Sequence, residues 1–293
     1  MAEGLNGSHP RVAIVGWEQL TNRELARELR ERHVRADLLS PSQALVLLEE
    51  GDIAIGRLDV LPTLDGVEPG LDSLTELEAR GVFVLNRAQA LLAAHDKLRT
   101  AERLGQAGLS HPWTIHIRSA DELLAPPLPA VVKPRFGSWG ACVFRCETEE
   151  ELDALLVELQ DTPWFAHDGV LVQEFVPNDG YDLRVIVAAG RVVGAAGRVA
   201  KPGEWRTNVS LGGARRRVIP TLEASSLAVR AAQAIGADFV GVDLIPTAGG
   251  FVVLELNGAV EFDHAYDLPG SDVYGALIEA LALPRPAPVL ALL

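Results

Sequence analysis

Three oxygen-bearing side chains occur close together near the end of the chain, within two apolar segments. Asp243 lies in FVGVDLI, and Glu255 and Asn257 lie in FVVLELN. Both segments are typical of buried β-strands, and the small residues between them predict a hairpin turn. If Thr247 pairs with Phe251, then Asp243 pairs with Glu255, and Asn257 lies one step further along the same face. Because a buried carboxylate without a partner is costly, these side chains are expected to share a ligand or a hydrogen-bond network.

The chemistry of this trio favours a hard cation. Oxygen ligands without sulfur or imidazole are typical of Mg²⁺ sites, where a few carboxylates act together with phosphate oxygens. The hairpin therefore predicts a magnesium site beside a phosphorylated ligand. In the alternative interpretation, the three residues make only turn and strand-edge hydrogen bonds, since a register shift of one residue would break their common face.

A second candidate segment is PAVVKPRFGSWGACV, in which Lys133 ends an apolar strand and Gly137, Ser138 and Gly140 follow in a turn. Glycines let backbone N–H groups approach phosphates, and a lysine supplies a mobile positive charge. The segment is not a Walker A motif, which places Gly-Lys-Ser/Thr directly before a helix. Alternatively it is an ordinary surface hairpin, and Trp139 is either a lid over a ligand or a side chain packed on a neighbour.

The elements that would position these residues begin with an N-terminal α/β unit. Its strands and helices are predicted to alternate, with strands over 11–17, 36–40, 52–56 and 81–86 and helices over 22–33, 41–50 and 73–80. Such alternation implies a small, mostly parallel sheet. The Gly-x-Gly-x-x-Gly pattern is absent after the first strand, so dinucleotide binding is not indicated. One helix is expected next, over residues 88–109.

The second half of the chain is dominated by antiparallel strand pairs with Gly-rich turns, interrupted by helices over 149–160 and 222–236. We therefore expect α/β architecture followed by α+β architecture. The expected domains are a flexible tail (1–10), an N-terminal α/β domain (11–90), a central subdomain with the glycine loop (91–170) and a C-terminal subdomain with the metal site (171–293).

Composition narrows the classes of partner. The chain has 293 residues, with 26 Lys and Arg against 40 Asp and Glu, and a formal net charge of −14. Such a surface repels nucleic acid and anionic lipid at long range, so neither is an expected partner. Two cysteines, Cys142 and Cys146, are too few for a disulfide scaffold and lack the partners of a zinc site. No signal peptide or membrane-spanning run is recognisable, so a cytoplasmic protein is expected.

Five segments, taken in order along the chain, resemble the ATP-grasp superfamily and, within it, the RimK-like amino-acid ligases. They are NRAQALLAAHDKLRT, VVKPRFGSWG, LVQEFVPNDGYDLRVIV, GRVAKPGEWRTNVSLGG and GVDLIPTAGGFVVLELN. The resemblance covers residues 86–258, and the α/β unit before them fits the family's N-terminal (pre-ATP-grasp) domain. It implies an ATP-grasp fold, in which ATP lies between two antiparallel sheets.

The resemblance also implies roles for individual residues at the nucleotide. Lys97 and Lys133 match the lysines that hold the phosphates, under the loop formed by Gly137, Ser138, Trp139 and Gly140. Glu174 and Phe175 match the hinge beside the adenine, and Asp182 matches the acid at the ribose hydroxyls.

Other matches concern the reacting phosphate. Arg198 matches the arginine at the transferred phosphate, and with Lys133 it forms the predicted catalytic pair. Arg206, Thr207 and Asn208 match a stretch near the triphosphate. Asp243, Glu255 and Asn257 match the Mg²⁺ ligands, and we expect Asp243→Asn to abolish ADP release with the fold intact.

The implied function is that of a carboxylate–amine ligase with ATP and Mg²⁺ as cofactors, or Mn²⁺ in place of Mg²⁺. In such ligases a substrate carboxylate attacks the γ-phosphate, and an amine then displaces phosphate from the acylphosphate to form an amide or peptide bond. The expected substrates are amino acids or peptides. Two alternatives use the same site: an ATP-dependent phosphotransferase (kinase) and a non-catalytic nucleotide-binding module. A homo-oligomer is compatible with the sequence.

Several charged residues near these segments remain open to two interpretations. Arg184 would share a face with Asp182, and either reaches the substrate or forms an ion pair with Asp182. Residues 215–217, all arginine, form either an anion-binding lip or a solvated strand end. His264 is either a base for the attacking amine or a structural residue, and the structural role is expected. Where relatives carry a Pro-Gly pair, this chain reads NGAVEFDH, and its two acids, at positions 261 and 263, suggest a cationic or amine-bearing substrate.

Overall fold

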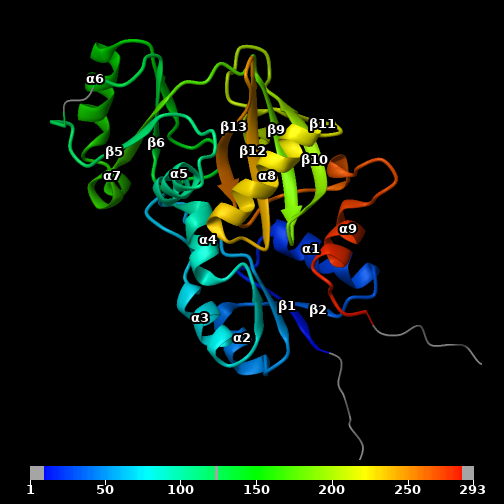
Figure 1. Cartoon of the computed structure of the whole chain (residues 1–293). Helices are drawn as coiled ribbons and strands as arrows, with labels where there is room; N and C mark the ends of the chain where they lie inside the picture. Colours follow the sequence, from blue (N-terminus) through cyan, green and yellow to red (C-terminus); the bar gives the residue numbers. More distant parts are fainter. Residues whose placement is uncertain (1–9, 123–124, 286–293) are drawn as a thin grey trace, which may run out of the picture.

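One parallel and two antiparallel sheets form the structure, a computed structural model that describes residues 10–122 and 125–285. In Figure 1 the green second sheet and the third sheet, which runs from yellow-green to orange, stand above the blue and cyan N-terminal unit. The predicted change from α/β to antiparallel architecture is confirmed by these sheets. Most of the expected flexible tail (1–10) lies outside the described residues.

The first sheet is parallel, with strand order β2-β1-β3-β4, and comprises β1 (Val12–Val15), β2 (Ala36–Leu39), β3 (Ile53–Gly56) and β4 (Phe83–Leu85). Every residue of β1 is buried, because helices cover both faces. Helix α1 (Leu20–Glu31) shares a core with one face, and α2 (Pro41–Leu47) and α3 (Leu71–Ala79) share a core with the other.

The single helix predicted over 88–109 is wrong, because the structure divides this segment into α4 (Ala88–His95) and α5 (Lys97–Gln106). Asp96 lies between them with an extended backbone, and its carboxylate accepts hydrogen bonds from the N–H groups of Leu98 and Arg99 at 3.1 and 3.3 Å. Aspartate is a favoured residue before a helix for this reason. The break makes Lys97 the first residue of α5.

The second sheet is antiparallel, with strand order β5-β8-β6-β7, and comprises β5 (Thr114–Ile117), β6 (Ala130–Pro134), β7 (Phe144–Cys146) and β8 (Val170–Glu174). Helices α6 (Glu149–Leu159) and α7 (Pro163–Asp168) form a hydrophobic core with it. Since β8 begins at residue 170, the expected domain boundary between 170 and 171 falls inside a strand of this sheet.

The third sheet is antiparallel, with order β11-β10-β9-β12-β13, and comprises β9 (Tyr181–Ala188), β10 (Arg191–Val199), β11 (Ala214–Arg217), β12 (Phe239–Thr247) and β13 (Gly250–Asn257). Helix α8 (Leu222–Ile235) covers one face. The other face is apolar at Ile186 and Ala188, where it packs with α1 and α9 (Val273–Ala280), and becomes polar two residues earlier at Arg184. Among the described residues, none of the helices combines the length and the apolar composition that a membrane span requires.

The β12–β13 hairpin has the predicted register at its polar residues but not at its turn. Thr247 pairs with Gly250 rather than with Phe251, so the predicted turn is wrong by one residue. A bulge then shifts the register between Leu244 and Asp243, and Asp243 pairs with Glu255 after all. The extra residue in β13 returns Asp243, Glu255 and Asn257 to the same face of the sheet.

Candidate active site

Two adjoining cavities lie where the polar face of the third sheet meets the second sheet and the N-terminal unit. The larger cavity encloses about 790 Å³ and the smaller about 570 Å³, both counted with their open mouths. The larger is lined by every residue predicted to contact nucleotide and by two further predicted residues: Lys97, Lys133, Gly137, Ser138, Trp139, Gly140, Glu174, Phe175, Asp182, Arg206, Thr207 and Asn208, with Arg198 and Glu255. Thus residues scattered between positions 97 and 255 of the sequence come together.

Two buried lysines reach the larger cavity. Lys97, on α5, donates from Nζ to the Gly137 carbonyl, and Lys133, on β6, donates to Oε1 of Gln173 at 2.7 Å. Burial lowers the pKa of Lys133 to about 8 and also lowers the pKa of Lys97, while the negative charge of Glu255 opposes both shifts. Among the described residues, neither ammonium group has a carboxylate within ion-pair distance. Two desolvated cations without an anion favour an anionic ligand.

The glycine turn is tied to a segment of the third-sheet domain. Nη1 of Arg206 donates to the carbonyls of Gly140 and Val143 at 3.3 and 3.2 Å, and the Ser210 hydroxyl donates to the Trp139 carbonyl at 2.9 Å. Trp139 is 49% exposed and lines both cavities, which fits a lid over a ligand better than a side chain packed on a neighbour. Figure 1 shows the two sheets that this loop bridges standing beside each other.

A buried network of two arginines and two aspartates forms part of the cavity walls. Arg198 binds Asp182 through Nε at 2.7 Å and Asp243 through Nη2 at 2.8 Å, and Arg184 binds both oxygens of Asp243 at 2.6 and 2.7 Å. Arg184 therefore makes its ion pair with Asp243, not with Asp182. The Thr207 hydroxyl donates to Asp182 at 2.6 Å, so the carboxylate matched to the ribose is already engaged and its predicted role there stays a prediction.

The three predicted metal ligands share one face but differ in availability. Asp243 is fully buried, and burial alone would raise the pKa of its carboxyl group. Arg184 and Arg198 nevertheless hold this pKa well below its usual range. Asn257 donates weakly to Asp243 at 3.4 Å, which leaves its amide oxygen free to face the smaller cavity. Glu255 has no hydrogen-bond or ion-pair partner within the described ranges, and it lines both cavities. Glu255 and Asn257 therefore fit a hard cation better than Asp243 does.

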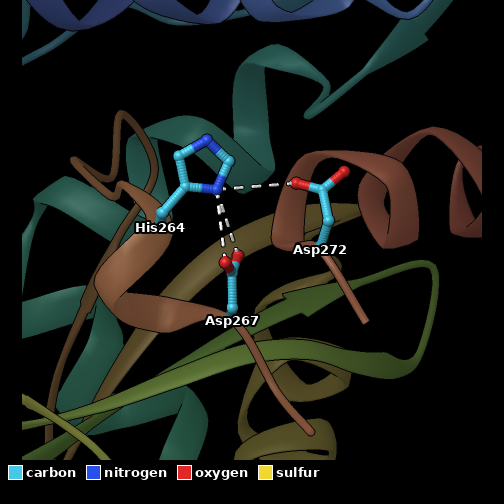
Figure 2. Close-up of side chains that lie close together, drawn as sticks. All are labelled: His264, Asp267 and Asp272. Carbon is cyan, nitrogen blue, oxygen red and sulfur yellow. Dashed lines mark hydrogen bonds and ion pairs between the residues drawn. The ribbon is translucent and has the colours of Figure 1, made fainter. Parts of the chain in front are cut away.

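A second cluster of possible ligands lies elsewhere, at the start of α9 (Figure 2). His264 Nδ1 lies 3.2 Å from Asp267 and 3.8 Å from Asp272. Asp272 caps α9 and pairs with Arg32 at 2.8 and 3.0 Å, and Asp267 accepts the N–H of Val273 at 3.0 Å. The carboxylates are thus engaged in holding α9 against α1, which agrees with the structural role expected for His264.

The smaller cavity contains residues that sequence reasoning did not select, His95 and Tyr266 among them, beside Asp59 from the long loop that follows β3. The three residues come from distant segments, and no short motif joins them. Arg215 lines the same cavity and pairs with Glu261 and Asp263, each at 2.9 Å. The two acids that suggested a cationic substrate are therefore neutralised in part by this arginine.

Comparisons with known proteins agree with this arrangement. The model of the RimK-like ATP-grasp domain matches residues 94–281. A probable alpha-L-glutamate ligase of Serratia proteamaculans is 33% identical over 79% of this chain and 77% of its own length. The tetrahydromethanopterin:alpha-L-glutamate ligase of Methanosarcina acetivorans is 31% identical over 82% and 85%, respectively.

The solved ATP-grasp ligase PsnB, in complex with a minimal precursor, Mg and ADP, superposes with a TM-score of 0.67 at 20% identity. The match covers 92% of this chain and 97% of that one. At this identity the likeness shows the fold alone, and it confirms the predicted ATP-grasp fold.

Proposed function

Because this chain belongs to the RimK-like ATP-grasp family, we propose that it is an ATP-dependent carboxylate–amine ligase acting on an amino acid or peptide. One observation carries the proposal. Lys97 and Lys133 are buried in the larger cavity without a carboxylate at ion-pair distance among the described residues, and Glu255, which has no partner there either, lines the same cavity. Since the curated relatives are alpha-L-glutamate ligases, L-glutamate is the first amino acid to test.

We assign the larger cavity to the nucleotide. Lys97 and Lys133 would neutralise the phosphates, and the loop over residues 137–140 would cover them. Glu174 and Phe175, at the end of β8, would border the adenine. Glu255 and Asn257 would hold Mg²⁺, which supplies positive charge at the phosphate oxygens when bound. Asp243 would join them only if one of its arginines moved away.

The reaction needs little covalent chemistry from the protein. The substrate carboxylate attacks the γ-phosphorus and ADP leaves, and the amine then attacks the acyl carbon, so phosphate leaves and the amine loses a proton. Catalysis by positioning and charge stabilisation is typical of phosphoryl transfer. Arg198 is fixed by Asp182 and Asp243, and it lines both cavities, where it would stabilise charge on the transferred phosphate.

The test is ADP release with ATP, Mg²⁺ and pairs of amino acids or short glutamyl peptides, followed by mass spectrometry of the products. A mass equal to the two substrates minus water identifies the ligase, whereas a retained phosphate identifies the phosphotransferase. Lys133→Ala should lower ADP release about 100-fold or more, while Lys201→Ala, at an exposed lysine outside the larger cavity, should not. Full turnover of Lys133→Ala, or no substrate-stimulated ADP release by the wild type, would overturn the proposal.

A further inference from the structure

A buried glutamine stands between Lys133 and the neighbouring strand in the wall of the larger cavity. Gln173, on β8, is 2% exposed, and its carboxamide oxygen accepts a hydrogen bond from Nζ of Lys133 at 2.7 Å. Its amide nitrogen donates to the hydroxyl of Thr114, on β5, at 2.8 Å. That hydroxyl donates in turn to the Pro112 carbonyl at 2.9 Å. A chain of three hydrogen bonds thus leads from the main chain to the lysine.

The second sheet places these side chains on one face. Thr114 lies directly opposite Gln173 where β5 pairs with β8. Lys133 lies on the other side, where β6 pairs with β8, two residues beyond the direct partner of Gln173 at position 131. Side chains two residues apart on a strand share a face, and such diagonal neighbours are within reach of long side chains. The contact between Gln173 and Lys133 therefore follows from the register of the sheet.

Each group in this chain of hydrogen bonds has only one way to bond. A carbonyl can only accept, so the Thr114 hydroxyl uses its proton on Pro112 and meets Gln173 as an acceptor. The amide nitrogen of Gln173 must then face Thr114, which turns the carboxamide oxygen towards Lys133. An ammonium group can only donate, so this orientation suits it, whereas a reversed carboxamide would bring two donors together. Thr114 therefore selects the orientation of Gln173.

Gln173 holds Lys133 without neutralising it. The charged groups around this ammonium are Lys97 from α5 and Glu255 from β13, and His111, from the segment before β5, also lies near. Burial lowers the pKa of Lys133 to about 8, with Glu255 opposing and Lys97 reinforcing the shift. Burial and the charge of Lys133 lower the pKa of His111 to about 4, so this imidazole is neutral at physiological pH. The one hydrogen-bond partner that the Lys133 ammonium has among the described residues is thus an uncharged amide.

A neutral acceptor and a carboxylate have different consequences at this position. Both can orient the ammonium group, but a carboxylate would also cancel its charge at short range. With Gln173 as the partner, the whole positive charge of Lys133 remains available for an anion in the cavity. Glutamine in place of glutamate therefore favours ligand binding over an internal ion pair.

We propose that Gln173 is a positioning residue for Lys133 in the nucleotide cavity. Its carboxamide oxygen, oriented by Thr114, directs the ammonium group of Lys133 at the phosphates and leaves its charge for them. The inference rests on the proposed function and deepens it, since it requires that the larger cavity bind a nucleotide. It assigns to Gln173 and Thr114 an effect on nucleotide affinity that acts through Lys133.

The decisive variant is Gln173→Glu, which changes the charge of the partner but not its size. The affinity for a fluorescent ADP, titrated with Mg²⁺ at neutral pH, should fall about tenfold or more, as expected where one contact to a charged group is weakened. A carboxylate raises the pKa of a neighbouring ammonium, so the loss of affinity with rising pH should also move from about 8 to a higher pH. Lys133 and Lys97 offset the burial of the new charge, so the melting temperature should stay within about 1–2 °C of the wild type.

Thr114→Val tests the orientation separately, because valine has the shape of threonine and no acceptor. Without the Thr114 hydroxyl the carboxamide of Gln173 can turn round, and ADP affinity should fall about threefold to tenfold, as for the loss of one neutral hydrogen bond. Lys133 keeps a neutral partner, so the pH at which affinity declines should stay near 8. A carboxylate has two equivalent oxygens and needs no orientation, so Thr114→Val should add little to the loss caused by Gln173→Glu.

Thr162→Val is the matched control. The Thr162 hydroxyl donates to the Leu159 carbonyl at 2.6 Å, and this residue lines neither cavity. The same chemical change here should leave ADP affinity and its pH dependence as they are in the wild type. A purely structural role for Gln173 would instead lower the melting temperature and the affinity together, without moving the pH at which affinity declines.

Two results would overturn the inference while nucleotide binding by the larger cavity stands: Gln173→Glu binds ADP as the wild type does at every pH, or Thr114→Val weakens binding no more than Thr162→Val. A wild type that binds no ADP contradicts the proposed function and the inference together. A wild type that binds ADP but releases none with any substrate pair contradicts only the ligase, because the affinity measurements need no turnover.

Discussion

Replacing Asp243 with asparagine should destabilise the fold as well as impair activity. Asp243 is fully buried and faces the guanidinium groups of Arg184 and Arg198, which are themselves only 12% and 5% exposed. Removing its charge leaves two desolvated cations with only Asp182 to neutralise them. Loss of one partner from a buried ion pair costs about 3–5 kcal/mol. Since asparagine keeps one acceptor oxygen, we expect the lower figure of about 3 kcal/mol.

Thermal and urea unfolding without nucleotide would measure this cost, which corresponds to a melting temperature lowered by about 6–12 °C. Because the folded pKa of Asp243 is depressed, its contribution is fully present above the unfolded value near 3.9 and is lost only as the pH falls through the folded value. The difference between variant and wild type should therefore be the same at pH 6 and pH 8.

Glu255→Gln is the control for the same experiment, since Glu255 has no partner to lose among the described residues. It should leave the melting temperature within about 1–2 °C of the wild type, as is usual where no interaction is removed, and should still abolish ADP release. If Asp243→Asn were as stable as wild type, the buried network would not support the fold. In that case Asp243→Asn would abolish activity and leave the fold intact, as the sequence alone predicts.

Three further substitutions test other parts of the site. Burial lowers the pKa of Lys133 to about 8, so this lysine loses its proton as the pH rises through 8, and nucleotide affinity should weaken. Arginine stays charged in this range, so Lys133→Arg should flatten the pH dependence of affinity in a fluorescent-ADP titration. Arg206→Lys cannot reproduce the bonds to the Gly140 and Val143 carbonyls, so the KM for ATP should rise about fivefold to tenfold; an unchanged KM would separate this arginine from the loop. Asp96→Asn should lower the free energy of unfolding in urea by about 3 kcal/mol, because Asp96 is 1% exposed, caps α5 and binds Arg135. A loss below about 1 kcal/mol would contradict this structural role of Asp96.

The residues that the sequence selects lie together in the structure, whereas the local backbone around them departs from the prediction in places. The nucleotide segments resemble ordered family motifs, and side chains on a strand alternate with a fixed period, so the common face of Asp243, Glu255 and Asn257 follows from the pattern. Two backbone details could not be read in this way. A bulge corrects the turn of the β12–β13 hairpin, and Asp96 ends one helix and begins the next, although its neighbours continue the helical pattern.

The sequence suggests only part of the smaller cavity, since residues 215–217 are a candidate anion-binding lip, whereas nothing in the pattern marks His95 or Tyr266. Asp59, His95, Arg215 and Tyr266 lie on four separate segments that meet only when the N-terminal unit packs against the third sheet. A lone histidine or tyrosine carries no signal of its own, and what distinguishes them is the lack of a partner after folding. That property belongs to the tertiary structure.

The charges around the larger cavity make nucleotide binding depend on a metal. Its lining has four cations, Lys97, Lys133, Arg198 and Arg206, against the three anions Glu174, Asp182 and Glu255, in a chain with a net charge of −14. An excess of one positive charge cannot neutralise a triphosphate, and the surrounding field repels anions. A divalent cation at Glu255 and Asn257 would supply the missing charge. Nucleotide affinity should therefore rise at least tenfold when Mg²⁺ is added, and Glu255→Gln should remove most of that gain, whereas equal affinity with and without Mg²⁺ would show that the lysines alone are sufficient.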